Sequence, residues 1–287
     1  MNPLLETLIM AGLVSREDAQ RMVWLLDPEA ARAYAEQVLT VAVQNGLTGQ
    51  QLRLVDMLRA NGFRIDDAAV DAFWRAEEQR LIAEWVPEFQ RVASEQAIAA
   101  LAQADGMAMW QAVDRAVIDW VEDYYISFDT NRVGSIPNIN EQSRTLIGNL
   151  FNQWQRGELD DAPTSEEGLP RLIAAMEEAF GTVRGERIAV TESTRIYSMS
   201  NVEAARANEF ITTLVSLSAA DELVCPVCGP LHGRQIAKMA DGFTHPERGM
   251  VGFPPFHVNC RCRIGARTEM TESLEIPEER WQYANHS

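Results

Sequence analysis

Apolar and polar positions alternate with a helical period through roughly the first two thirds of the chain. Apolar residues recur every three to four positions, which places them on one face of an α-helix. The longest pattern runs from Asp67 to about Gln103, and its stripe is Trp74, Leu81, Trp85, Phe89 and Val92. We expect Pro87 to kink or divide this helix, because proline removes a backbone hydrogen bond.

A second long stripe follows between Met107 and Phe128. Its members are Trp110, Val113, Val117, Trp120 and Tyr124. Two stripes of matching length, separated by Asp105-Gly106, predict an antiparallel helical hairpin. Large aromatic side chains at these spacings are interpreted as core.

Shorter helices are predicted on both sides of this hairpin. Asn45-Gly46 and Asn61-Gly62 are typical helix ends, and Thr164 with Glu167 forms a capping-box pattern. Residues 129–140 carry several turn-forming residues and predict a break. These signals predict helices over residues 4–11, from 15 onward, and over 28–44, 48–61, 141–154, 164–180 and 184–209.

The pattern changes near Glu209. Ile211 to Leu217 is rich in residues that favour β-strands, and short strands and turns are expected from there to Ala266. The fold class is therefore α+β, with helical hairpins in the N-terminal part and a small α+β domain near the C-terminus. We expect three regions: residues 1–130, residues 138–267 and an acidic tail, 268–287.

Charge follows the same division. The chain has 287 residues and a net charge of −17, made up of −15 in residues 1–183, +2 in residues 184–267 and −4 in the last twenty residues. An acidic surface argues against non-specific coating of a nucleic-acid backbone. Leu8 to Val14 is too short to span a bilayer and has no positive charge before it, so we expect no membrane association and a cytoplasmic site of synthesis.

All four cysteines lie between residues 225 and 262, in two short motifs. Cys225-Pro-Val-Cys228 is followed by Gly229, and two residues between thiolates let both sulfurs reach one metal ion. His257 and Cys260 repeat that spacing. We therefore predict a structural Zn²⁺ held by Cys225, Cys228, His257 and Cys260, with Cys262 as the alternate fourth ligand.

Zinc binding and folding of this segment should be coupled, because the metal holds the thiolates as anions. A thioredoxin-like redox pair is the competing interpretation of the C-x-x-C, but no βαβ unit precedes it. The small C-terminal domain is thus predicted to be stabilised by zinc.

Other polar residues carry weaker signals. Arg261, Arg263 and Arg267 crowd beside the predicted metal site and are candidates for DNA or phosphate contacts. Pairing with the chain's own surplus acids is the favoured interpretation, because the net charge of −17 repels a polyanion at long range. Glu192 and Arg195 are interpreted as an ordinary helical ion pair. The remaining histidines, His232, His245 and His286, are expected in solvated loops or the tail.

Over residues 138–265 the sequence resembles the phage Mu F-like minor head proteins, also called the head morphogenesis family. The resemblance rests on Ile188-Ala-Val-Thr-Glu-Ser-Thr-Arg195, Asp221, the C-x-x-C at 225–228, Leu231-x-Gly233 and Pro254-Pro-x-His-x-x-Cys-Arg-Cys262. One departure is Ser216, where the family usually has Trp. This difference puts the local packing of that strand in question.

The resemblance implies a structural, non-enzymatic minor head protein of a tailed phage or prophage. It would associate with the portal protein, take part in head assembly and in DNA packaging or ejection, and reside in the virion head near the portal. The resemblance suggests two further kinds of partner: scaffold or major capsid protein, and weakly bound double-stranded DNA. The alternative is a zinc-containing nuclease of the HNH type, in which His257 would act in catalysis.

Overall fold

The computed structural model describes residues 28–103, 110–126, 128–129, 132–133, 135–218 and 225–268. The predicted helices before residue 28, the Asp105-Gly106 junction, Asp221 and His286 lie outside this part. The chain forms two compact units. The first comprises the chain up to Leu39, Gln90–Asp119 and the chain from Val190, and the second comprises Thr40–Phe89 and Trp120–Ala189.

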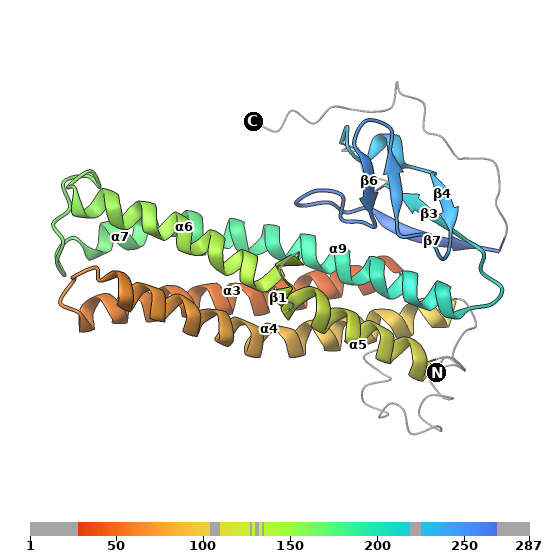
Figure 1. Cartoon of the computed structure of the whole chain (residues 1–287), viewed down its shortest axis with the longest axis horizontal. Coiled ribbons are helices and arrows are strands. Elements are labelled where there is room, and N and C mark those ends of the chain that lie inside the picture. The colour runs from red at the N-terminus through yellow and green to blue at the C-terminus, as the bar shows by residue number, and fades with distance from the viewer. Residues whose placement is uncertain are drawn as a thin grey trace. The chain divides into compact units, whose positions relative to one another are not determined.

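Helices account for most of the described chain, so the prediction of a mostly helical α+β protein is confirmed (Figure 1). The helices are α3 (Pro28–Ala60), α4 (Asp67–Gln103), α5 (Trp110–Ile126), α6 (Ser135–Gln155), α7 (Leu169–Ala175), α8 (Glu177–Phe180) and α9 (Thr182–Ala207). None of these helices combines the length and apolar character needed to cross a membrane.

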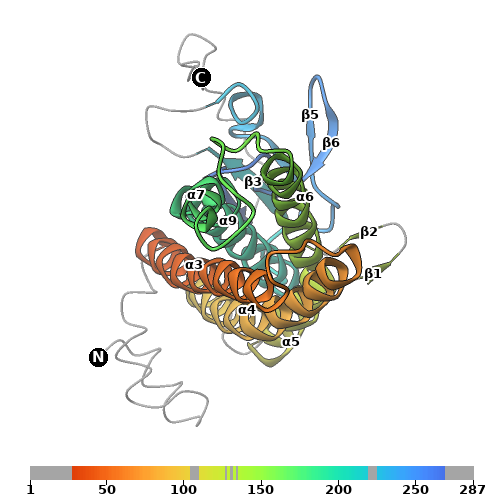
Figure 2. The same ribbon diagram turned by 90° about the vertical axis from the view of Figure 1, so that its left-hand side faces the viewer.

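In the described part of the chain, the strands form three small antiparallel sheets. In the second unit, β1 (Phe128–Asp129) pairs with β2 (Arg132–Val133). In the first unit, β4 (Gln235–Ala237), β3 (Thr213–Leu217) and β7 (Arg263–Arg267) form a sheet in that order. The hairpin of β5 (Phe243–His245) and β6 (Gly249–Gly252) forms the third sheet (Figure 2), and a 3₁₀ turn, η3 (Gly229–Leu231), follows the C-x-x-C.

Helix α3 passes straight through Asn45-Gly46, where a helix end was predicted. Gly46 is buried, and a Cβ atom placed on it would lie only 2.3 Å from Nε1 of Trp85 in α4. The glycine therefore serves close packing of α3 against α4, and tertiary contact outweighs its weak local tendency to end a helix. The second predicted end is correct, because Gly62 follows the helix with a φ of +58°.

Helix α4 has the predicted bounds, and its aromatic stripe is buried. Pro87 lies within the helix and does not divide it. In α5 the predicted face is partly wrong: the buried positions are Val113, Val117, Val121 and Tyr125. Trp120 and Tyr124 stack on each other with their ring centroids 5.4 Å apart and remain half-buried beside that face.

As the chain advances along α4, its contact partners in α5 move back toward the start of α5. Phe89 contacts Tyr125, and the Ser94 hydroxyl donates to Asp114 at 2.6 Å. This order is that of antiparallel helices, in agreement with the predicted hairpin.

Two helix starts differ from the prediction. Helix α6 begins at Ser135, not at Glu141, because Pro137 is tolerated in a first helical turn. Thr164 does not cap a helix. The chain turns through residues 165–168, and α7 begins only after Gly168.

The second unit combines an aromatic core with a few buried polar contacts. Gln50 donates to Asn140 at 2.9 Å, and Asn140 donates to the carbonyl of Trp74 at 3.1 Å. The fully buried Glu77 carboxylate accepts two bonds from Arg53, at 2.8 and 2.7 Å, and a further bond from Arg80. Asn140 of α6 thus contacts both α3 and α4, and the Glu77 carboxylate connects α4 to α3. These contacts join the three helices.

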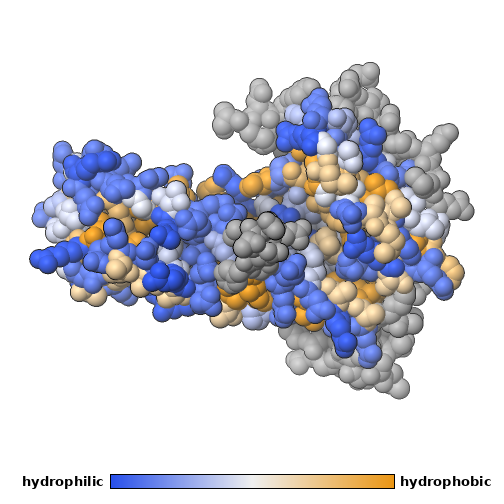
Figure 3. All heavy atoms as spheres, viewed as in Figure 1, coloured by the Kyte–Doolittle hydropathy of each residue, from blue (hydrophilic) through white to orange (hydrophobic). Residues whose placement is uncertain are grey.

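The strand region of the first unit, residues 211–218 and 225–268, has a much smaller apolar core. Seven buried residues form it, two from helix α9 and five from the strand region: Val202, Ala205, Ile211, Leu214, Leu231, Phe243 and Ile264. Met239, Met250 and Val258 are exposed, and Figure 3 shows apolar residues among polar ones over these strands. A core of this size leaves much of the region's stability to other interactions.

Candidate metal centre

Two turns of the same kind build the candidate metal centre. The amides of Cys228 and Gly229 both donate to the carbonyl of Cys225, at 3.0 and 2.9 Å. In the second turn the Cys260 amide donates to the carbonyl of His257 at 3.2 Å. Each turn presents two side chains separated by two residues to the same point, as the spacing predicted.

The structure brings all five predicted donors together. Cys225, Cys228 and His257 form one group whose ligand atoms lie within 4.8 Å of one another. Cys228, Cys260 and Cys262 form a second group within the same limit. Cys228 is common to both groups, so its sulfur lies at the centre of the cluster.

The distances suit a tetrahedral ion. Cys228 Sγ and Cys260 Sγ are 3.8 Å apart, and a tetrahedron with metal–sulfur bonds of about 2.3 Å has edges of about 3.8 Å. His257 Nε2 lies 3.0 Å from Cys225 Sγ and 3.1 Å from Cys228 Sγ. The cluster is therefore compatible with a metal site, and five donors compete for four places.

The orientation of His257 supports the same conclusion. Its Nδ1 lies 2.7 Å from the carbonyl oxygen of Val258. Because a carbonyl only accepts, Nδ1 carries the proton and Nε2 is left to face the sulfurs. A backbone carbonyl that fixes the tautomer in this way is a common partner of metal-ligating histidines.

The side chains of the cluster shift one another's pKa values. The hydrogen bond with Cys228, followed by the one with His257, lowers the pKa of Cys225 to about 4. Contacts with Cys228 and Cys262 also lower the pKa of Cys260. Cys228 keeps its proton, because its neighbours raise its pKa, Cys225 most of all. The pKa of His257 rises to about 10 through its contacts with Cys225 and Cys260.

These shifts describe a cluster of thiolates next to an imidazolium. Thiolates are the form of cysteine that binds metal. A divalent cation would stabilise these thiolates, and its binding would release protons from the cluster.

Helix α9 fixes the second turn through one hydrogen bond. The Asn259 amide donates to the hydroxyl of Thr191 at 2.9 Å, and Asn259 adopts a φ of +62°. Thr191 is buried and belongs to the Thr-Glu motif identified in the sequence. The sequence indicated that motif, but nothing in it showed that the threonine contacts the loop carrying His257 and Cys260.

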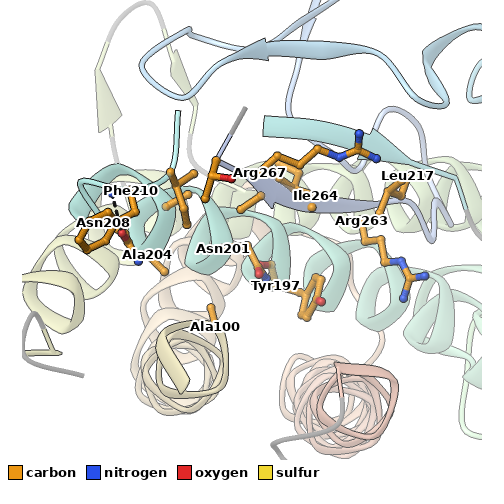
Figure 4. A pocket seen from close by; sticks show the side chains of 15 residues that line it. Ala100, Tyr197, Asn201, Ala204, Asn208, Phe210, Leu217, Arg263, Ile264 and Arg267 are labelled. Carbon is orange, nitrogen blue, oxygen red and sulfur yellow. Dashed lines mark hydrogen bonds between the residues drawn. The ribbon is translucent and has the colours of Figure 1, made fainter. Parts of the chain in front are cut away.

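The three arginines near the cluster do not converge. Arg261 lies 3.5 Å from the carboxylate of Glu36, 225 positions away in the sequence. Arg263 and Arg267 belong to β7 and line a groove beside α9, where Figure 4 shows their guanidinium groups pointing in different directions. Arg261 thus forms an ion pair with an acidic residue of the same chain.

Two other histidine predictions are wrong. His245 is buried in β5, and its Nδ1 accepts from the Glu247 amide at 3.1 Å. His232 is half-buried, and its Nδ1 accepts from the amide and hydroxyl of Ser218. Burial lowers the pKa of His232. Both rings are therefore held by the fold, His245 at the end of β5 and His232 in the turn after η3.

The Glu192–Arg195 pair behaves as the sequence suggested, whereas the departure at Ser216 does not disturb its strand. Arg195 donates to Glu192 at 3.2 Å along one helix, which is the ordinary ion pair. Ser216, at the position where the family usually has Trp, lies opposite Ile264 in a regular pairing of β3 with β7. The smaller side chain leaves the strand register intact, and its buried hydroxyl has no hydrogen-bond partner among the described residues.

Fold and site together describe a mostly helical α+β protein with a Cys/His cluster of metal-binding character. Residues 161–265 match the family described as Phage Mu protein F like protein. The resemblance expected from the sequence is thus confirmed over this segment, which begins at residue 161 and not at 138. No curated protein and no solved structure gave a match to the chain.

Proposed function

We propose that the protein is a minor head protein of a tailed phage or prophage that acts in head morphogenesis. The observation that carries this proposal is the family match over residues 161–265, which includes every residue of the metal cluster. A position in the virion, at the head interior near the portal, follows from the same family. The portal vertex is where such a protein would contribute to assembly and to DNA packaging or ejection.

The metal that we propose is Zn²⁺ in a structural role. Three protein thiols and an imidazole form a donor set that zinc prefers, and four protein ligands leave no open position for a substrate. We assign Cys225, Cys228, His257 and Cys260 as ligands, with Cys262 as the alternate. Bound zinc would supply a rigid link between the two turns.

An enzymatic role is the weaker proposal. An HNH nuclease needs a general-base histidine beside a catalytic metal that is separate from any structural zinc. In the described part of the chain, the groups of three or more metal-ligating side chains are the two that share Cys228. We therefore propose a non-enzymatic protein, and a plasmid-cleavage assay with Mg²⁺ or Mn²⁺ tests it. Cleavage that His257→Ala abolishes would support the nuclease.

The portal protein is the proposed main partner, through the helices. On α3, Val41 and Leu52 are 54% and 61% exposed. They are eleven residues apart, about three helical turns, and so lie on one face. Exposed apolar side chains that share one face of a helix are the residues through which we propose that α3 docks on the portal.

Co-expression with the portal protein followed by size-exclusion chromatography tests this partner. The full chain is used, because a cut near residue 183 would divide both compact units. Val41→Arg combined with Leu52→Arg should abolish co-elution, whereas Met239→Arg combined with Met250→Arg in the strand region should retain it. The opposite result would show that the portal protein binds the strand region and not α3.

Scaffold or major capsid protein and double-stranded DNA are secondary partners in this proposal. DNA affinity is expected to be weak, because the net charge of −17 repels a polyanion at long range. If Arg261, Arg263 and Arg267 contact phosphates, binding should fall steeply as salt rises and should weaken in each alanine variant. A salt titration by fluorescence anisotropy measures both effects.

A further inference from the structure

The metal cluster holds one donor more than a tetrahedral zinc site uses. If Zn²⁺ takes the four assigned ligands, the thiol of Cys262 is left over. This thiol is not peripheral, because Cys262 is only 3% exposed and its sulfur lies within 4.8 Å of the sulfurs of Cys228 and Cys260. Three buried sulfurs that meet at one point are a candidate site of their own, with a chemistry that differs from that of the zinc site.

The two groups of donors that share Cys228 differ in composition and burial. The group of Cys225, Cys228 and His257 includes a nitrogen donor, and both Cys225 and His257 are half-buried. The group of Cys228, Cys260 and Cys262 consists of thiols alone, and all three are buried. Thiolates are the ligands that soft ions such as Cu⁺ prefer. The second group therefore suits a softer ion than the first.

The number of ligands separates zinc from copper further. A structural Zn²⁺ takes four ligands, so three thiolates would leave its fourth position to water. The three thiols pack as one buried cluster with Phe256 against it, and such an apolar setting disfavours a water molecule there. Cu⁺ accepts three thiolates in a trigonal plane and needs no fourth ligand. The buried trio thus fits Cu⁺ better than Zn²⁺.

The sulfur positions are compatible with a trigonal ion. Metal–sulfur bonds of about 2.3 Å in a trigonal plane place the sulfurs about 4.0 Å apart. The sulfurs of Cys228 and Cys260 are 3.8 Å apart, and the sulfur of Cys262 lies within 4.8 Å of both. At most a small displacement of the Cys262 sulfur completes the triangle.

We propose that Cys228, Cys260 and Cys262 bind one Cu⁺ ion as a trithiolate, in a second state of the cluster that excludes zinc. The proposal rests on the structural zinc proposed above for the first state. The two states exclude each other because Cys228 and Cys260 are ligands in both. Binding of Cu⁺ replaces the thiol protons of the three cysteines and frees Cys225 and His257, the two half-buried donors. Copper thus keeps the two turns linked through buried thiols and leaves their more exposed donors without a metal.

Metal competition in the full-length protein tests the two ligand sets. Cu⁺ is supplied without oxygen as its bicinchoninate complex, and its transfer is read from the loss of colour and from elemental analysis. Cys262→Ser should keep zinc and lose Cu⁺ binding, whereas His257→Ala should lose zinc and keep Cu⁺ binding. Uptake of Cu⁺ by Cys262→Ser as in the wild type would overturn the trithiolate. Absence of zinc binding in the wild type would instead refute the structural zinc, so the two failures are distinguishable.

X-ray absorption of the wild-type protein is the second measurement and needs no variant. The zinc form should show three sulfurs and one nitrogen around Zn²⁺, and the copper form should show three sulfurs and no nitrogen around Cu⁺. Each Cu⁺ that binds should release one Zn²⁺ into solution. A nitrogen ligand on copper, or copper and zinc bound together to one chain, would contradict the proposal.

Discussion

The second unit and the strand region of the first unit bury different kinds of side chain. In the second unit, long helices bury large aromatic side chains, among them Trp74, Trp85 and Trp154. The strand region has a core of seven mostly aliphatic residues and, beside it, a cluster of five metal-binding side chains. The comparison leads us to propose that the strand region, which is too small to build a large core, gains stability from a metal bound by this cluster.

We expect the largest effect from removal of the metal, and we expect it in the strand region and not in the second unit. Cys228→Ser takes away the sulfur that both donor groups share, and a structural zinc carries about 10 kcal/mol or more of apparent binding free energy. We expect zinc content to fall from one per chain to none. Amide exchange should accelerate in residues 225–268 and remain slow in residues 40–89, as measured by elemental analysis and hydrogen exchange.

The control for this variant is Cys262→Ser, which should retain zinc. Loss of zinc from Cys262→Ser alone would instead make Cys262 the fourth ligand in place of Cys260. Full zinc occupancy in Cys228→Ser would contradict the assignment of the site.

The reciprocal change in the second unit is Trp154→Ala. Trp154 is fully buried, packs edge-to-face on Phe63, and donates from Nε1 to the carbonyl of Pro163 at 3.0 Å. Loss of a buried Trp costs about 3–5 kcal/mol, so the free energy of unfolding should fall by that amount in chemical denaturation. Zinc content should not change, and a loss of zinc would show that the two regions do not hold their structure independently.

The two regions also differ in how much of their structure could be predicted from the sequence. The period of α4 and the bounds of α9 could be predicted, because long stripes of apolar residues leave little ambiguity. The continuation of α3 through Gly46 could not, because its cause is the ring of Trp85, 39 positions away. In the metal centre, fixed spacing identified the five donors, whereas the contact with Thr191 depends on how α9 packs and has no signal in the spacing.

A smaller effect is expected from the buried ion pair of the second unit. Glu77 is fully buried, and Arg53 makes two of its hydrogen bonds while about a third of the Arg53 side chain stays exposed. Arg53→Met should lower the free energy of unfolding by on the order of 2 kcal/mol, since Arg80 still balances part of the charge. The double variant Arg53→Met with Glu77→Leu should recover much of this loss, because it leaves no unpaired carboxylate in the core.

Denaturation by urea with tryptophan fluorescence measures both variants. A single variant as stable as the wild type would show that Arg80 alone satisfies Glu77. In either case the metal centre should be unaffected, because no residue of this pair lies in the first unit.

The smallest expected effect comes from Thr191→Val, which tests how helix α9 supports the metal centre. The valine keeps the shape but removes the hydroxyl that accepts from the Asn259 amide, and such a bond contributes about 1 kcal/mol. Since Asn259 lies between His257 and Cys260, we expect zinc transfer to a chelator to accelerate about fivefold, while the unfolding of the second unit is unchanged. Ser193→Ala is the matched control, because the Ser193 hydroxyl bonds only the carbonyl of Val190 in its own helix among the contacts resolved for it. Equal zinc-transfer rates in the two variants would show that the Thr191 contact does not position the ligands, and that the turn of His257 and Cys260 holds its shape through its own backbone.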